Sequence, residues 1–222
     1  MLRDIDLNEI SDGKLYGNND MVKAGCGGCT GCSDCCKGMG SSIILDPLDV
    51  HRLCVCLGKS FYELMDEALE LNVADGVILP NLKMTDTDDA CFFLDDKGRC
   101  SIHACRPGIC RLFPLGRFYE NDSFSYFLQI HECSKKDRTK VKVRKWIGIT
   151  DINRYEKYIL DWHNFLKRLG EHILSPGGEE DVKKTGMYVL KTFYVQPYEE
   201  KKDFYEQFYE RLQAADKSHL YS

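Results

Sequence analysis

An amphipathic pattern of helical period dominates the last third of the chain. Seven apolar residues recur there at alternating steps of three and four, which places them on one face of a long helix. They are Ile152, Tyr155, Ile159, Trp162, Leu166, Leu169 and Ile173. The run Ser175-Pro176-Gly177-Gly178 is expected to end this helix. Two more helices are predicted, one around Val182, Val189, Leu190 and Phe193, and one that Pro197 opens and that carries Phe204, Phe208 and Leu212.

Start signals predict two shorter helices in the first half of the chain. Asp46 is a predicted N-cap, with Pro47 at the first helical position. Ser60 and Glu63 have the spacing of a capping box, and the helix that follows them is expected to continue to Leu71. Helical structure is therefore expected in the first half of the chain from residue 47 onward.

Strand patterns follow these helices. Residues 91–94 and 100–103 are predicted to pair as a hairpin around the turn residues 95–98, with a cysteine on each arm. Residues 113–119 and 124–130 are predicted to form a second hairpin around Asn121 and Asp122. The basic run at 135–145 is interpreted as a solvated strand edge, with Val141 and Val143 facing inward.

Composition limits the class of protein. The 222 residues, 43% of them apolar, suffice for one substantial core or two small ones. The N-terminal residues are acidic where a signal peptide needs a basic end, and no apolar run approaches the length of a membrane span. We therefore expect a cytoplasmic protein with no membrane partner. In that compartment thiols stay reduced, so patterned cysteines indicate metal binding or catalysis before disulfides.

The net charge of -5 is unevenly distributed. Residues 1–133 hold 12 Lys and Arg against 21 Asp and Glu, whereas residues 134–222 hold 18 against 14. Affinity for nucleic acid depends mainly on cationic contacts to phosphate. We therefore expect no nucleic-acid partner for the first, acidic part.

Ten of the twelve cysteines fall into two groups. The first group, within eleven residues, consists of Cys26, Cys29, Cys32, Cys35 and Cys36. Two-residue gaps let successive sulfur atoms turn toward one point, and Gly25, Gly27, Gly28 and Gly31 are expected to supply positive φ angles. The second group, expected to fold over the first, consists of Cys91, Cys100, Cys105, Cys110 and Cys133. Cys54 and Cys56 stand apart and are interpreted as small buried packing groups.

The crowding of the first group favours a polynuclear centre. The spacing Cys26-x2-Cys29-x2-Cys32-x3-Cys36 is that of the bacterial ferredoxin run, although Lys37 stands in the place of its proline. An iron–sulfur cluster of the 4Fe-4S type is the expected cofactor. Zinc is the alternative, because two Cys-x2-Cys pairs can also make a tetrahedral thiolate site. One centre or two are both compatible with this spacing, since Cys35 and Cys36 are adjacent and one of them can turn toward the second group.

Several separated motifs occur in the order of a known family. They are Cys29-Thr30-Gly31-Cys32-Ser33-Asp34-Cys35-Cys36, Cys91-Phe92-Phe93-Leu94, Gly98-Arg99-Cys100-Ser101-Ile102-His103 and Arg106-Pro107-Gly108-Ile109-Cys110-Arg111-Leu112-Phe113-Pro114. Through them the chain resembles the YkgJ-like cysteine-cluster (CxxCxxCC) family, whose members are described as zinc- or iron-chelating proteins. The resemblance covers roughly residues 26–133. It implies metal ligands at Cys29, Cys32, Cys35, Cys36, Cys91, Cys100, Cys110 and Cys133, while Cys26 and Cys105 are candidates in addition to the family pattern.

Two arginines flank one of these cysteines. Arg106 and Arg111 stand on either side of Cys110, where a guanidinium group can offset the charge of a thiolate-bound cluster or pair with a nearby carboxylate. His103 and His131 also lie close to cysteines and are expected to form hydrogen bonds within the fold more readily than to bind metal.

The predicted fold class is α+β. Residues 1–149 form a cysteine-cluster metal-binding region with helices and small antiparallel hairpins, and residues 150–222 form a helical C-terminal cap packed on it. The expected function is that of a metal-centre protein with one or two iron–sulfur clusters, used in electron transfer, in metal or cluster handling, or in a protein-modification reaction. The alternative is a structural zinc module that binds a protein partner. The sequence does not decide whether the chain is an enzyme.

Overall fold

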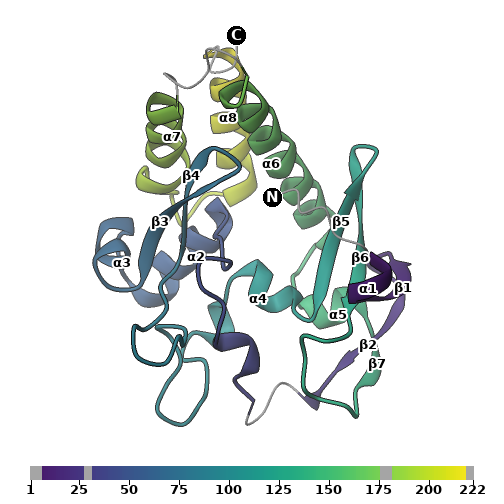
Figure 1. Cartoon of the computed structure of the whole chain (residues 1–222). Coiled ribbons are helices and arrows are strands. Elements are labelled where there is room, and N and C mark those ends of the chain that lie inside the picture. The colour runs from purple at the N-terminus through teal and green to yellow at the C-terminus, as the bar shows by residue number, and fades with distance from the viewer. Residues whose placement is uncertain (1–6, 28–31, 176–181, 219–222) are drawn as a thin grey trace. The chain divides into compact units, whose positions relative to one another are not determined.

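The computed structural model describes residues 7–27, 32–175 and 182–218. It combines helices with small antiparallel sheets and has a helical C-terminal region, so the predicted α+β class is confirmed (Figure 1). None of the helices within the described ranges is both long and apolar enough to cross a lipid bilayer.

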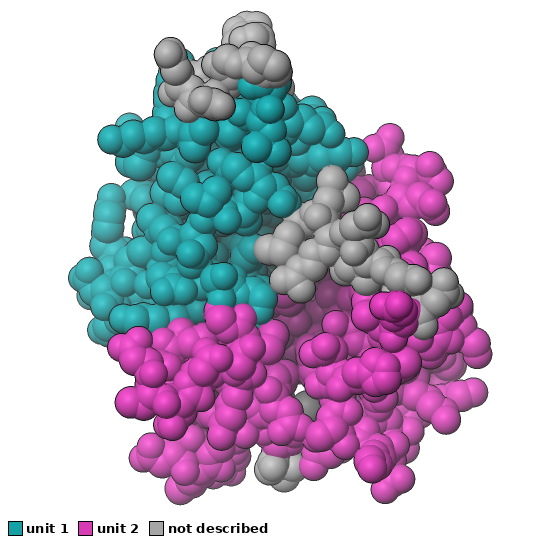
Figure 2. All heavy atoms as spheres, viewed as in Figure 1, with its two compact units in different colours: residues 1, 41–83, 161–222 teal, residues 2–40, 84–160 magenta. Residues whose placement is uncertain are grey.

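The chain divides into two compact units that do not follow a single boundary in the sequence (Figure 2). The helical unit contains residues 41–83 and 161–222, and the cysteine unit contains residues 2–40 and 84–160. This division differs from the linear one expected at residues 149 and 150. It arises because the segment 41–83 packs with the C-terminal helices, whereas the N-terminal strands pair with strands that follow residue 115.

The helical unit consists of helices around a two-stranded sheet. Its elements are α2 (Pro47–Leu57), α3 (Phe61–Glu67), β3 (Leu69–Ala74), β4 (Val77–Leu82), the second part of α6 (Ile152–Ile173), α7 (Val182–Leu190), the π-helix η5 (Lys191–Val195) and α8 (Phe204–Lys217).

Both predicted helix starts in this unit are confirmed. The Asp46 side chain accepts a hydrogen bond from the Asp49 amide at 2.9 Å, and Pro47 opens α2. The Ser60 hydroxyl accepts from the Glu63 amide at 3.3 Å, while the Glu63 carboxylate accepts from the Ser60 amide at 2.8 Å. These reciprocal bonds satisfy amides that have no partner within the first turn of a helix.

Two expectations for this unit were wrong. The helix after Ser60 ends at Glu67, and Leu69–Ala74 forms β3, which pairs in antiparallel register with β4 around a turn at Asp75 and Gly76. The last helix begins at Phe204, with Asp203 as its N-cap, and not at Pro197. In the first case pairing with β4 overrides the helical pattern. In the second, the Asp203 side chain supplies the cap by accepting from the Glu206 amide at 3.0 Å.

Aromatic side chains fill the core of the helical unit, as the helical spacing predicted. Trp162 and Phe165 of α6 pack against Phe193 of η5, with ring centroids 5.0 and 5.4 Å apart. Phe208 of α8 lies 5.8 Å from Phe193. Phe165, Phe193 and Phe208 are fully buried. Such ring pairs contribute more than their buried area alone.

Replacement of a central ring should therefore destabilise this unit strongly. We expect Phe165→Ala to lower the free energy of unfolding by about 3–5 kcal/mol, because it leaves a cavity among fixed rings. Urea-induced unfolding, followed by tryptophan fluorescence, measures this. Leu174→Ala is the matched control, since Leu174 is 74% exposed, and it should change stability by less than about 0.5 kcal/mol. Equal effects of the two substitutions would contradict the assignment of this core.

The cysteine unit is built on two small antiparallel sheets. Its strands are β1 (Ser11–Tyr16), β2 (Met21–Gly25), β5 (Leu115–Glu120), β6 (Ser123–Gln129) and β7 (Thr139–Lys142), ordered β1-β6-β5 and β2-β7. Its helices are α1 (Leu7–Ile10), α4 (Gly108–Leu112), α5 (Val143–Ile147), the first part of α6, and the short 3-10 helices η2 (Asp34–Cys36) and η3 (His103–Cys105).

The sequence predicted one hairpin of this unit and mispredicted another. The β5–β6 hairpin is confirmed, with positive φ angles at Asn121 and Asp122 in its turn. Residues 91–94 and 100–103 were wrongly predicted as strands, because their pairing is limited to the isolated bridge Leu94↔Cys100 and does not extend into a regular ladder. Local turns take their place, with the Leu94 amide bonded to the Cys91 carbonyl and the Cys105 amide to the Ile102 carbonyl. These residues make a compact loop instead of a regular sheet.

Candidate metal centre

Backbone hydrogen bonds join the two cysteine groups. The Cys91 amide donates to the Cys36 carbonyl at 2.7 Å, and the Gly38 amide donates to the Asp89 carbonyl at 2.8 Å. The isolated bridge Lys37↔Ala90 lies between them. Because Cys36 belongs to η2, these bonds bring the end of the first cysteine group against the start of the second. The predicted approach of residues from the two groups is therefore present at Cys36 and Cys91.

A tight loop then returns the chain to the same place. The Asp95 carboxylate accepts from the amides of Lys97 and Arg99 at 2.9 and 2.8 Å, which confirms its role as a turn former. Gly98 takes a φ of 69°, and the Ser101 amide bonds the Phe93 carbonyl at 2.8 Å. This loop carries Cys100 back toward Cys91.

Cys35, Cys91 and Cys100 influence one another electrostatically, and the Cys36 thiol bonds with that of Cys35; we call Cys35, Cys36, Cys91 and Cys100 the four-thiol group. A hydrogen bond with Cys36, followed by burial, holds the pKa of Cys35 far above its usual range. Burial raises the pKa of Cys91, and the neighbouring thiols Cys100 and Cys35 add to that rise. Burial is also the main cause of the raised pKa of Cys100, to which Cys35 contributes. Without a metal ion Cys35, Cys91 and Cys100 are therefore held in the neutral form.

Arg106 is the cation whose charge acts on this group. Its positive charge favours the thiolates of both Cys35 and Cys100, opposing the effect of burial on their pKa values. The Arg106 guanidinium also bonds the Nε2 atom of His103. Burial and the charges of Arg106 and Arg111 lower the pKa of His103, so this imidazole is neutral near pH 7.

Arg111 has a different role from Arg106. Its Nε atom donates to the Arg106 carbonyl at 3.0 Å, and its Nη2 atom donates to the Ala104 carbonyl. Both bonds fix the backbone of the loop that carries Arg106. In the described contacts Arg111 therefore acts as a support for this loop.

A side-chain contact ties two further cysteine segments together. The Ser134 hydroxyl donates to the Asp34 carboxylate across 100 residues of sequence. This bond is the main cause of the lowered pKa of Asp34, to which a bond from the Cys32 thiol also contributes. Ser134 follows Cys133 directly, so the contact draws the Cys133 segment toward Cys32. We call this contact the Asp34–Ser134 latch.

Sequence reasoning missed this latch. The functional prediction concerned Cys32 and Cys133, and nothing in the spacing of an exposed aspartate and a distant serine indicates that they meet. The local signal was limited to the position of each residue beside a cysteine.

Two glycines of the first group serve different purposes. Gly27 has the expected positive φ of 67°. Gly25 was wrongly expected to share it, because Gly25 is the last residue of β2 and pairs with Thr139. A Cβ atom at Gly25 would lie 2.5 Å from Oγ1 of Thr139, so close strand approach explains this glycine. Gly28 and Gly31 lie outside the described residues.

The other candidates are distributed around the cysteine unit. Cys26 follows β2 and Cys110 lies in α4, both half-buried, while His131 is exposed. Cys29 lies outside the described residues. Cys105 is disulfide-bonded and therefore offers no thiolate in this structure. In the helical unit Cys54 is half-buried, but Cys56 is exposed and disulfide-bonded, so its expected role as a buried packing group was wrong.

The described sulfur ligands are of the type that zinc and iron bind, although they do not surround a common point in this structure. Within the described ranges, no three Cys, His, Asp or Glu side chains already form a group that could hold an ion. The four-thiol group nevertheless consists of soft sulfur ligands beside a cation, and these are the ligands that zinc and iron–sulfur centres select.

Clustered cysteine donors of this kind define a metal-chelating class of protein. Residues 28–139 match the model of the CxxCxxCC family, described as "Putative zinc- or iron-chelating domain". The chain belongs to this family, and the resemblance noted in its sequence is confirmed. No curated protein and no solved structure matches the chain significantly.

Removal of the latch should weaken metal binding without removing a ligand. We expect Ser134→Ala to lower the affinity for zinc by about 10-fold or more, because contacts that orient ligand segments from behind have effects of this size. Competition with a chromophoric zinc chelator measures the affinity. Ser123→Ala is the matched control, since Ser123 is an exposed serine at the tip of β6 in the same unit. Unchanged affinity in Ser134→Ala would show that the latch does not position the ligands.

Proposed function

We propose that this chain is a cytosolic iron–sulfur protein that holds one or two clusters of the 4Fe-4S type in its cysteine unit. The observation that carries the proposal is the four-thiol group beside Arg106. Cys32 and Cys133, drawn together by the latch, would complete the ligand set with Cys29. Electron transfer or the handling of metal and clusters would be the use of such a centre.

The number of thiols supports more than one metal ion. A structural zinc ion takes four ligands. The four-thiol group already has that number, and Cys32 and Cys133 lie in segments that the latch joins. A polynuclear cluster, or two centres, would use this excess, and four cysteine thiolates are the usual ligands of one iron–sulfur cluster.

The charge balance also favours a thiolate cluster. Several thiolates in a half-buried place repel one another, and the raised pKa values of Cys35, Cys91 and Cys100 reflect part of this cost. Arg106 would offset the negative charge and donate hydrogen bonds toward cluster sulfur. When bound, the cluster would supply one-electron redox chemistry, while Arg106 and the fixed loop from Cys91 to Cys100 would hold its ligands.

A structural zinc site is the second candidate. The specific observation in its favour is that the four-thiol group has the ligand number of a zinc site made of four cysteines. In that case the metal would stabilise the cysteine unit, which would present its surface to a protein partner. Colour separates the two candidates, since an iron–sulfur protein is brown and a zinc protein is colourless.

Substitution of one thiol in each unit tests the site. We expect Cys91→Ser to remove at least one centre, because Cys91 lies within electrostatic reach of Cys35 and Cys100. Cys54→Ser is the matched control, since Cys54 is another thiol whose pKa burial raises, but it lies in α2 of the helical unit. Iron, zinc and acid-labile sulfide are measured after anaerobic purification.

The outcomes distinguish the candidates. Iron and sulfide in equal amounts, lost in Cys91→Ser and kept in Cys54→Ser, support the iron–sulfur proposal. Zinc without sulfide, with the same response to the two substitutions, supports the structural zinc site. Equal metal content in the wild type and Cys91→Ser would place the centre elsewhere.

Metal removal should loosen the cysteine unit first. Residues 32–40 make few backbone hydrogen bonds apart from those of η2 and those to residues 89–91. After chelation we expect faster hydrogen exchange at the Gly38 and Cys91 amides, because metal binding and folding are coupled where burial is limited. Exchange in the β5–β6 hairpin, with its six paired positions, is the internal control. Unchanged protection at Gly38 and Cys91 would contradict this coupling.

A further inference from the structure

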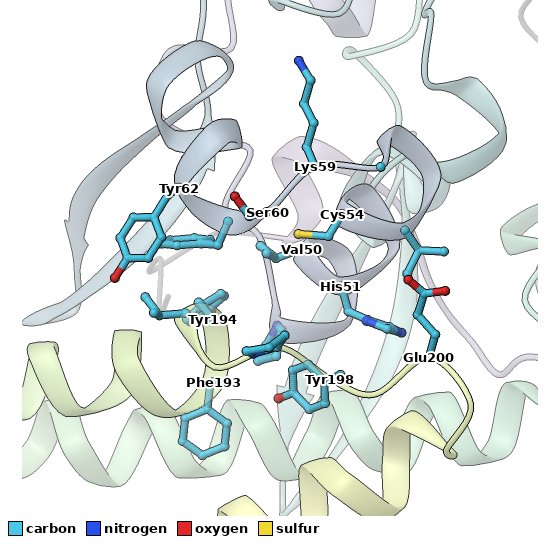
Figure 3. A pocket seen from close by; sticks show the side chains of 16 residues that line it. Val50, His51, Cys54, Lys59, Ser60, Tyr62, Phe193, Tyr194, Tyr198 and Glu200 are labelled. Atoms are coloured by element: carbon cyan, nitrogen blue, oxygen red, sulfur yellow. The ribbon is translucent and has the colours of Figure 1, made fainter.

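The helical unit contains a pocket that the metal centre does not use. It has a volume of about 410 Å³ and lies between α2, α3 and the segment from η5 to Glu200 (Figure 3). His51 and Cys54 of α2 line one side, and Tyr194 and Tyr198 line another (Figure 3). This volume lies in the range of pockets that bind small molecules.

Aromatic rings make up much of the lining. Phe61 lies 6.1 Å from Tyr62 and 6.2 Å from Tyr194, measured between ring centroids, and His51 lies 5.6 Å from Tyr198. Their planes are inclined to one another by 36° to 65°. Inclined rings at these distances can accept a further flat ring by edge or face contact.

Hydrogen bonds fix the wall of the pocket. The Arg211 guanidinium donates to the carbonyls of Gln196 and Pro197 at 2.7 Å each, and it covers the Tyr198 ring at 3.7 Å. The Tyr194 hydroxyl donates to the Leu45 carbonyl at 2.9 Å. The wall is therefore formed in advance, and a ligand would not have to order it.

The charges around the pocket favour an uncharged ligand. Burial lowers the pKa of His51, so the imidazole is neutral near pH 7. Lys59 at the rim is paired with Glu67. The charge of Glu200 raises the pKa of His51, whereas the charges of Arg52 and Arg211 lower it. The charged side chains in the lining, Lys59 and Glu200, have opposite signs, so the pocket offers no net charge to a ligand.

We propose that this pocket binds a small, neutral aromatic molecule. The π-helix η5 is part of the argument, because such turns are rare and occur frequently at functional sites. Here η5 places Phe193, Tyr194 and Val195 in the lining. The Cys54 thiol on the opposite wall provides a reporter of occupancy.

Fluorescence of an uncharged probe tests the proposal. N-phenylnaphthylamine should bind the full-length protein saturably with one molecule per chain. Cys54→Trp should weaken this binding by at least about tenfold, because the indole would fill the pocket. Val73→Trp is the matched control: Val73 is 67% exposed on β3 of the same unit and does not line the pocket. It should leave the affinity unchanged.

Alkylation of the wild-type protein tests the same point without a substitution. Saturating probe should slow the labelling of Cys54, which peptide mass mapping detects separately from the other cysteines. The labelling result tests the proposal even if Cys54→Trp does not fold. Non-saturable binding, equal affinity in folded Cys54→Trp, or unchanged Cys54 labelling would overturn the proposal. Tighter binding of the anionic analogue anilinonaphthalene sulfonate would overturn the assignment of a neutral ligand.

Discussion

The hydrogen bond from the Cys91 amide to the Cys36 carbonyl is the contact on which the arrangement of the cysteine unit depends. It fixes the meeting point of two cysteine groups that are more than fifty residues apart in the sequence. The loop through Asp95 then sets the position of Cys100 relative to Cys91, and Arg111 sets that of Arg106. The position of each donor thus depends on backbone geometry.

In this arrangement the thiols oppose one another's ionisation. Thiols that lie close to one another away from water resist ionisation, and the raised pKa values of Cys35, Cys91 and Cys100 have this cause in part. A bound cation reverses the effect, because a thiolate is the form that binds metal. The same proximity that disfavours the thiolates in the metal-free chain therefore favours them around an ion. Arg106 acts in the same direction as the ion.

Local signals predicted much of the fold, and pairing between distant segments decided the rest. The stripe from Ile152 to Ile173 and the caps at Asp46 and Ser60 can be read from a few neighbouring residues, and all are present. Leu69–Ala74 was misread because its apolar residues also suit a helix, whereas β4 and the bridge Ile44↔Asn81 make it part of a small sheet. In the site, cysteine spacing indicated the donors, but no spacing could indicate the bond between Asp34 and Ser134.

The two units obtain their order from different sources. Phe165, Phe193 and Phe208 are fully buried in the helical unit, and this core needs no ion to form. In the cysteine unit, the short helices Asp34–Cys36 and His103–Cys105 contain no buried residue, whereas Cys91 and Phe93 are buried. Apolar burial therefore contributes little to the order of η2, which carries Cys35 and Cys36. Ligand bonds to a metal ion would supply there the ordering free energy that burial does not.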